Sequence, residues 1–312
     1  MKKNNRMKIL RGAFLIVVAI FLARYFYRNM DDILALDLTL RPLPFAVSIL
    51  FYCIYKMTQA SLWHYITCIN DASIGYRKAV KAYLYSILGK YIPGKVFMLL
   101  ARIPPYKEEG VSADKVTVCF LLENCCTILG AALLFVVSIL FFPNEVLGGY
   151  KWTAFVLIAV FFVCIHPKIL NYLLALLERV SRKKMMRIPM SYAQILKVVL
   201  LFVLNWLAYG FGFYMLVCSI CPLPLSKCLY VSGIYALSCI AGILAVFSPS
   251  GIGVREGILA LGLGLIMDTN YAMIISIVAR LWAILVELVL IGILFAADKM
   301  GRNWIVGKEF RS

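Results

Sequence analysis

The sequence predicts an all-α polytopic membrane protein, with about six spanning helices and two re-entrant hairpins that form an inverted repeat. Hydrophobic residues make up 63% of the 312 residues and charged residues only 15%, whereas soluble domains are about 45–50% apolar. Several apolar runs approach or exceed the roughly 20 residues that a spanning helix needs. Two further apolar segments are interrupted by Gly and Pro. These runs fill the chain, so we expect residues 1–312 to form a single membrane domain.

The expected spans are six apolar runs: Ile9–Phe26, Leu43–Ile66, Val116–Phe142, Trp152–Ile165, Leu196–Ile220 and Tyr271–Ala297. The first run follows a basic N-terminal stretch and in this respect resembles a signal peptide. It has no small-residue cleavage site, and Arg24 and Arg28 follow its apolar part. We therefore interpret it as a retained first span.

The net charge of +17 is explained by the positions of the 32 Lys and Arg residues along the chain. With a cytoplasmic N-terminus, most of them fall in inner segments, namely the N-terminal arm and residues 77–81, 102–115, 168–197 and 299–311. This bias is typical of bacterial-type inner-membrane proteins. It predicts a multi-pass protein of the cell (inner) membrane with both termini in the cytoplasm. We expect no nucleic-acid partner, because no basic and aromatic binding module accompanies the charge.

Five cations and three acids lie at apparent membrane depth. They are Lys56, Lys90, Lys95, Arg255, Arg280, Glu123, Glu256 and Glu287. Charges at this depth face a partner or a cavity rather than lipid tails. Internal pairing is one interpretation, with Arg280 on Glu287 and Arg255 near Glu256. The other is that the excess of cations binds an anionic ligand.

Two apolar segments carry these charges and also break the helical pattern. The first is Ala79–Ile103, which contains Gly89, Lys90, Pro93, Gly94 and Lys95; the second is Tyr230–Met267, which contains Pro249, Gly251, Gly253, Arg255 and Glu256. Pro removes a backbone donor and Gly permits a sharp reversal, so neither segment is expected to be one continuous helix. The apolar stretch Ile258–Met267 is too short to cross a bilayer of about 30 Å. We interpret both segments as re-entrant hairpins.

Hairpins entering from opposite sides give two similar units of inverted orientation, approximately residues 43–142 and 196–297. In such repeats the substrate site lies near the midplane, where broken helices direct backbone N–H groups toward an anion. We expect Lys90, Lys95 and Arg255 to contact a lipid phosphate. Arg280 is expected to support the site from the last span, and Glu123 or Glu256 to hold the cations in place or to exchange a proton.

Two motifs resemble signatures of one known family. They are Gly89-Lys90-Tyr91-Ile92-Pro93-Gly94-Lys95-Val96, followed by Arg102, and Pro249-Ser250-Gly251-Ile252-Gly253-Val254-Arg255-Glu256-Gly257, followed by Arg280. The family is the flippase-like membrane domain shared by lysylphosphatidylglycerol synthases and by stand-alone membrane proteins. The resemblance covers about 300 residues and implies translocation of lipids, or participation in export of lipid-linked saccharides or modified phospholipids. Glu123 matches the family, while Asn124 and Thr127 stand where an Arg and an Asp are often found.

The expected ligand is thus an anionic membrane lipid: a phospholipid, an aminoacyl-phospholipid or a polyprenyl-phosphate-linked saccharide. Two alternatives stay open, a membrane-embedded lipid-modifying enzyme and a scaffold that docks a glycosyltransferase or lipid-modifying enzyme. Family members that transfer lysine carry a cytosolic transferase domain. This chain stops at Ser312, soon after its last span, and we do not expect it alone to synthesise lysylphosphatidylglycerol.

No catalytic motif, cofactor or metal site is expected. His64 and His166 are the only histidines and form no ligand pattern. Cysteines within the apolar runs are interpreted as small hydrophobic residues. Cys218 and Cys221, with Cys228 nearby, leave a disulfide or a metal open, although a single Cys-x-x-Cys pair is a weak signal.

Overall fold

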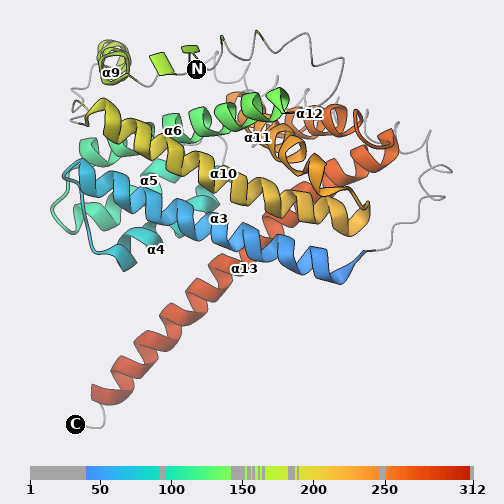
Figure 1. Cartoon of the computed structure of the whole chain (residues 1–312). Coiled ribbons are helices and arrows are strands. Elements are labelled where there is room, and N and C mark those ends of the chain that lie inside the picture. Colours follow the sequence, from blue (N-terminus) through green and yellow to red (C-terminus); the bar gives the residue numbers. More distant parts are fainter. Residues whose placement is uncertain are drawn as a thin grey trace, which may run out of the picture.

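The computed structural model describes residues 40–91, 96–141, 166–181, 190–245 and 251–309, and isolated positions between 152 and 189. Every regular element in these ranges is helical (Figure 1). In chain order they are α3 (Pro42–Ile69), α4 (Tyr76–Ser86), the 3₁₀ turn η1 (Ile87–Tyr91), α5 (Val96–Lys107), α6 (Ala113–Leu140), α9 (Pro167–Ser181), α10 (Tyr192–Ile220), the 3₁₀ turn η2 (Leu225–Lys227), α11 (Cys228–Leu244), α12 (Val254–Leu263) and α13 (Thr269–Glu309).

Five of the described helices are long and apolar enough to cross a membrane: Pro42–Ile69, Ala113–Leu140, Tyr192–Ile220, Leu225–Leu244 and Thr269–Ala296. Four of them contain or largely overlap spans predicted from the sequence, which confirms the prediction of an all-α polytopic membrane protein. The predicted span Ile9–Phe26 lies outside the described residues, and Trp152–Ile165 does so in large part.

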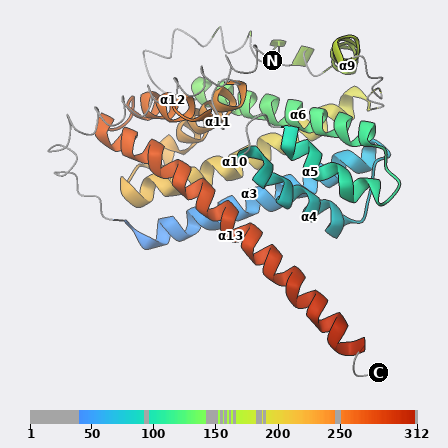
Figure 2. The same ribbon diagram turned by 180° about the vertical axis from the view of Figure 1, so that it is seen from behind.

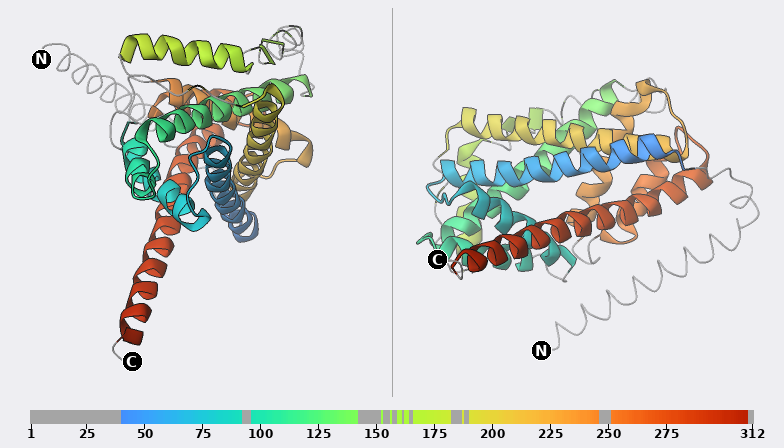
Figure 3. Two further views of the ribbon diagram at one scale, coloured as in Figure 1. Left: turned by 90° about the vertical axis from the view of Figure 1, so that its left-hand side faces the viewer. Right: turned by 90° about the horizontal axis from the view of Figure 1, so that it is seen from below.

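Helices α3 and α10 form the central pair of the bundle and lie side by side along most of their length (Figures 1 and 3). They run antiparallel, because the backbone N–H of Arg41, just before α3, donates to the carbonyl of Ser219 at the end of α10 over 2.8 Å. A Cβ at Gly212 would lie 3.0 Å from the Cβ of Phe51. The missing side chain therefore lets the two helices approach closely, as small residues do in membrane bundles.

Local sequence explains where these two helices begin. Pro42 occupies the first turn of α3, where its missing N–H would have no helical partner. Ser191 and Gln194 form a reciprocal capping box at the start of α10. The Gln194 N–H donates to Ser191 Oγ over 3.3 Å, and the Ser191 N–H donates to Gln194 Oε1 over 2.8 Å.

The first predicted helix break lies between η1 and α5, because η1 ends at Tyr91 and α5 begins at Val96. Pro93, Gly94 and Lys95 fall outside the described residues. Gly89 explains how the two limbs meet: a Cβ there would lie 2.7 Å from the backbone nitrogen of Met98. Only glycine permits this contact between the backbones of η1 and α5.

The second predicted break separates α11, which ends at Leu244, from α12, which begins at Val254. Pro249 lies outside the described residues. Gly251 and Gly253 have φ angles of 72° and 85°, a region that glycine adopts without steric cost. The two limbs differ in length. Residues Leu225–Leu244 are long enough to span, whereas α12 has 10 residues, so re-entry of both limbs as a hairpin stays a prediction.

The predicted basic inner segment 168–197 is not a simple loop, because it contains α9. Leu170 and Leu174 on this helix are buried, while Tyr172 and Leu176 are exposed. Figure 3 shows α9 on the outside of the bundle. The last helix, α13, has 41 residues, about 60 Å at 1.5 Å per residue. Its C-terminal part extends away from the other helices (Figures 1 and 2).

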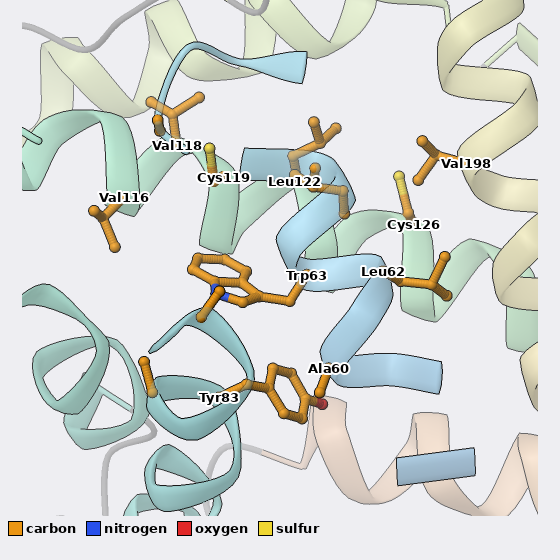
Figure 4. Close-up of a cluster of buried hydrophobic side chains, with 14 of the residues drawn as sticks. Ala60, Leu62, Trp63, Tyr83, Val116, Val118, Cys119, Leu122, Cys126 and Val198 are labelled. Atoms are coloured by element: carbon orange, nitrogen blue, oxygen red, sulfur yellow. The ribbon is translucent and has the colours of Figure 1, made fainter. Parts of the chain in front are cut away.

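Two hydrophobic clusters of buried side chains hold the bundle together. The first centres on Trp63 of α3 and joins Tyr83 of α4 to Cys119 and Leu122 of α6 (Figure 4). The second packs α3, α6 and α10 against α11, α12 and α13. Each cluster spans one of the two helix breaks, so the interrupted segments are fixed by packing on continuous helices.

Replacing Gly251 by Ala is expected to destabilise the protein strongly. The new Cβ would lie 2.5 Å from the Cα of Gly242 on α11, on a backbone with positive φ. The matched control is Gly257→Ala in α12, where nothing lies within 4 Å and helix propensity favours Ala by about 1 kcal/mol. Thermal unfolding in detergent should show a clear loss for Gly251→Ala and none for Gly257→Ala. Equal melting temperatures would contradict the close backbone contact.

Candidate functional site

A pocket of about 200 Å³ that contains several charged side chains lies inside the bundle, where the two broken segments meet the long helices. Its walls come from α3, α4, η1, α5, α6, α10, α11, α12 and α13. Four cations and two carboxylates line it: Lys56, Lys90, Arg102, Arg255, Glu123 and Glu287. Most of the remaining wall is aromatic or aliphatic. Charges at such depth require partners or a ligand.

Glu287 on α13 is the central carboxylate of the pocket, and its side chain is 1% exposed. Lys56 Nζ from α3 lies 2.9 Å from Glu287 Oε1, and Lys90 Nζ from η1 donates to the same oxygen over 2.6 Å. The hydroxyl of Tyr52 also donates to this oxygen over 2.7 Å. One carboxylate therefore ties α3, the first broken segment and the last helix together, and two ammonium groups share it.

Arg255 lies at the start of α12 and lines the same pocket. Its Nη2 donates to the hydroxyl of Tyr235 over 2.5 Å, and its guanidinium stands 5.0 Å from the centroid of the same ring. Tyr235 in turn donates to the hydroxyl of Tyr209 over 2.8 Å. Among the described residues, no carboxylate forms an ion pair with Arg255. Its charge is held by neutral hydroxyls and aromatic faces, which leave it available to an anion.

Arg102 and Glu123 form a closed ion pair on the α5–α6 side of the pocket, with side chains 1% and 4% exposed. Arg102 Nε also donates to Ser86 Oγ over 2.9 Å. Its guanidinium lies 4.3 Å from the ring centroid of Trp63 and 4.4 Å from that of Tyr83. The pair is buried, hydrogen-bonded to Ser86 and flanked by aromatic rings, which help to offset the cost of burying its charges.

Glu256 and Arg280 form a third pair, which lies behind the pocket wall. Arg280 Nη1 donates to Glu256 Oε1 over 2.6 Å. The other carboxylate oxygen accepts the N–H of Gly253 over 2.6 Å at the start of α12. The pair thus fixes the beginning of α12 against α13 and so sets the position of Arg255, which precedes Glu256 in the chain.

The structure brings together some of the predicted site residues and separates others. Lys90, Arg255 and Glu123 line one pocket. Arg280 and Glu256 do not line it and act as the support just described. Gly89, Gly251 and Gly253 shape the breaks, whereas Lys95, Pro93, Gly94 and Pro249 lie outside the described residues.

The two internal pairings considered from the sequence are wrong. Glu287 pairs with Lys56 and Lys90 rather than Arg280, and Glu256 pairs with Arg280 rather than with Arg255. Helical spacing suggested Arg280 with Glu287, but the start of α12 lies closer to Arg280. The assignment of Arg102 to an inner basic segment also needs correction, because its side chain is buried against Glu123.

Sequence reasoning missed the aromatic part of the pocket. Tyr52 and Tyr55 stand three residues apart on α3 beside Lys56, whose Nζ lies 5.5 and 5.1 Å from their ring centroids. Tyr55 stacks on Tyr209 of α10, with centroids 4.0 Å apart. The sequence did contain a signal for this lining: Tyr52 and Tyr55 lie at helical spacing, next to Lys56, within an apolar run.

A family comparison agrees with these features. The family model described as the lysylphosphatidylglycerol synthase TM region matches residues 9–292. The chain belongs to this family. Membership links the membrane domain to lipid modification or transport, and it covers both broken segments and every residue of the pocket. No curated protein matches the sequence.

Two pocket residues occupy the positions where the chain departs from the expected family pattern. Asn124 donates from Nδ2 to the Phe120 carbonyl over 2.7 Å. The Thr127 carbonyl accepts the indole N–H of Trp206 over 3.0 Å. Both lie in the wall as neutral groups, so in this chain they add no charge to the pocket.

The described residues contain no group of three or more His, Cys, Asp or Glu that could hold a metal. Cys218, Cys221 and Cys228 are free thiols. Cys218 Sγ lies 3.8 Å from the Leu223 carbonyl. The suggested disulfide between Cys218 and Cys221 is therefore not formed in this structure.

Replacing either partner of the Arg102–Glu123 pair should lower the stability of the protein. Glu123→Gln and Arg102→Gln each leave one buried charge without its partner, a loss of about 3–5 kcal/mol. The double variant Arg102→Met with Glu123→Leu removes both charges and should recover much of this loss. Thermal unfolding in detergent measures all three. The exposed pair Lys78–Glu109, with side chains 65% and 39% exposed, is the control, and Glu109→Gln should change little. Additive losses in the double variant would contradict a closed pair.

Proposed function

We propose that this membrane domain binds the anionic head group of a lipid in the pocket and moves it across the bilayer. One observation carries the proposal: Lys90 and Arg255, from the two separate helix breaks, face the same cavity. Lys56 joins them from α3. A phosphate is the common anionic group of membrane lipids, and both ammonium and guanidinium groups bind it.

The charge balance of the pocket supports an anionic ligand rather than a neutral one. Arg102 and Glu123 neutralise each other as a closed pair. Glu287 then remains as the only described carboxylate of the pocket to face Lys56, Lys90 and Arg255. An uncompensated cation at membrane depth costs about 2.5–3.5 kcal/mol or more. An anionic ligand would offset that cost.

The volume of the pocket supports a head group rather than a whole lipid. Pockets for drug-sized ligands are about 300–1,000 Å³, and this one is about 200 Å³. Acyl or prenyl chains would therefore stay outside among the apolar helix faces. Leu261 and Leu285 are examples of large apolar side chains that are 77% and 61% exposed and suited to contact with lipid.

The helix packing supports an inverted repeat of residues 43–142 and 196–297. In the first unit, α4 packs on α3 and α5 on α6. In the second unit, α11 packs on α10 and α12 on α13 in the same chain order. The two leading helices, α3 and α10, meet in an antiparallel pair. Repeats of this kind expose a midplane site alternately to the two sides of the membrane.

Movement of the two units against each other is the transport step in this proposal. Arg255 lies in the first turn of α12, where the positive end of the helix dipole adds to its own charge. Rocking of the α10–α13 unit relative to α3–α6 would open the pocket to one side and then to the other. The inner membrane is the proposed location, with both termini in the cytoplasm.

Reconstitution in vesicles tests the function. The purified chain would be incorporated with labelled phosphatidylglycerol, a polyprenyl-phosphate sugar or neutral phosphatidylcholine, and movement between leaflets measured. Faster movement of the anionic lipids alone supports a flippase. Binding without movement would favour the alternative of a scaffold for a glycosyltransferase or lipid-modifying enzyme. Absence of both binding and movement would reject the proposal.

Arg255 should be required for lipid binding but not for folding. Arg255→Lys keeps the charge and loses the planar fork that binds phosphate bidentately, so binding should weaken in part. Arg255→Ala should abolish it. Membrane abundance should stay normal, because among the described residues no carboxylate pairs with Arg255. Loss of the protein itself in Arg255→Ala would instead assign Arg255 a structural role.

Topology gives an independent check of the inverted repeat. After replacement of the native cysteines, a single cysteine at Gly149 should react with an impermeant reagent from outside. One at Lys183 should react only from inside. Both positions lie outside the described residues and belong to the connection between the two units. Labelling of position 149 solely from the cytoplasm would overturn the proposed orientation.

A further inference from the structure

We infer that the pocket selects a lipid head group with two negative charges, as in a phosphomonoester or a diphosphate linkage, over a singly charged phosphodiester. The inference deepens the proposed function and rests on it. Its basis is the set of contacts that Glu287 makes. Among the described pocket residues, this carboxylate cancels one of the three cations outside the Arg102–Glu123 pair, and so sets the charge that a ligand would supply.

Three cations face the ligand region of the pocket, and each comes from a different element. Lys56 on α3 is 8% exposed, Lys90 on η1 lies with its side chain 29% exposed, and Arg255 is half-buried at the start of α12. Glu287 holds both lysines through ion pairs. Counted over the described residues, the region carries two positive charges more than negative ones.

The Arg102–Glu123 pair adds no net charge, and the other described wall residues of this region are uncharged, so they do not change the count. Tyr52, Tyr55 and Tyr209 present aromatic rings and hydroxyls. Asn124 and Thr127 add neutral groups at positions where the family pattern allowed an Arg and an Asp. An Arg and an Asp together would add no net charge, and neither do Asn124 and Thr127. The excess among the described residues is therefore the one that Glu287 leaves.

An isolated excess charge in a low-dielectric cavity is unfavourable, and a ligand that cancels it completely is bound best. A phosphomonoester carries about −1.5 to −2 at pH 7, and a lipid diphosphate joined to a sugar carries a similar charge. A phosphodiester such as phosphatidylglycerol carries one negative charge. Its lysyl ester adds two amines, which would face Lys56, Lys90 and Arg255 as like charges.

Binding of short-chain lipids to the purified full chain in neutral detergent tests the inference. The probes are dioctanoyl phosphatidic acid, phosphatidylglycerol and phosphatidylcholine, which share their acyl chains, together with inorganic phosphate. Phosphatidic acid should bind about tenfold more tightly than phosphatidylglycerol, a difference of about 1.4 kcal/mol. Phosphatidylcholine should not bind measurably. Inorganic phosphate should bind far more weakly than phosphatidic acid, because it has no chains to contact the apolar helix faces.

Two variants change the count in opposite directions: Arg255→Gln removes a positive charge and shortens the side chain, and Glu287→Gln removes a negative charge at nearly constant shape. Arg255→Gln lowers the excess by one, and should weaken phosphatidic acid most and remove the preference over phosphatidylglycerol. Glu287→Gln raises the excess by one and should tighten phosphatidic acid, although the unliganded protein will melt at a lower temperature. Phosphatidic acid should raise the melting temperature of Glu287→Gln by more than it raises that of the wild-type chain. This larger shift distinguishes tighter binding from a loss of stability alone. Glu109→Gln removes one acid from an exposed pair and should leave all affinities unchanged.

The outcomes separate this inference from the proposed function. Equal affinity for phosphatidic acid and phosphatidylglycerol would overturn the charge selection and leave anionic-lipid binding in place. Weaker binding of phosphatidic acid by a folded Glu287→Gln variant would also overturn it, because the carboxylate would then act only as a support. If inorganic phosphate bound as tightly as phosphatidic acid, the pocket would be a site for a free anion rather than for a lipid, and the inference would be wrong. Wild-type chain that binds none of the probes would reject the proposed function itself.

Discussion

The cost of placing charges and unpaired backbone groups in a bilayer governs this structure. An unpaired polar group exposed to hydrocarbon costs several kcal/mol of free energy. Helix breaks and charges at membrane depth are therefore stable only where protein or a water-filled cavity surrounds them. Both breaks are closed by contact between glycine and backbone, Gly89 on Met98 and Gly251 on Gly242. The three buried acids of the described bundle each hold at least one cation. Backbone packing and ion pairing thus both reduce the free-energy cost of polar groups inside the membrane.

The three ion pairs have different roles, because their carboxylates lie in different places. The Arg102–Glu123 pair is sealed among aromatic rings and joins α5 to α6. The Arg280–Glu256 pair fixes the start of α12 on α13. Glu287, in contrast, faces the cavity and shares its charge between Lys56 and Lys90. Among the described ion pairs, this third arrangement leaves a net positive charge at the pocket, to which Arg255 adds its own.

Arg255 illustrates how support and binding are divided between neighbouring residues. Glu256 points back to the helix N-terminus and to Arg280, while Arg255 points to the tyrosines of the pocket. The tyrosine hydroxyls orient the guanidinium without neutralising it. A carboxylate in the position of Tyr235 would hold Arg255 more strongly and would compete with an anionic ligand. The aromatic pocket is therefore suited to hold cations in place while their charge remains available.

The sequence by itself determined the class of the protein, most of its spans, both helix breaks and the charged residues at depth. These properties follow from local rules: apolar run length, the backbone effects of Gly and Pro, and the cost of charge in a membrane. Tertiary structure alone decided which charges pair. Glu287 lies more than 190 residues from Lys90 along the chain, and no sequence period relates them. Burial of Arg102 and the tyrosine lining of the pocket were hidden for the same reason, because they depend on which helix faces meet when the units pack.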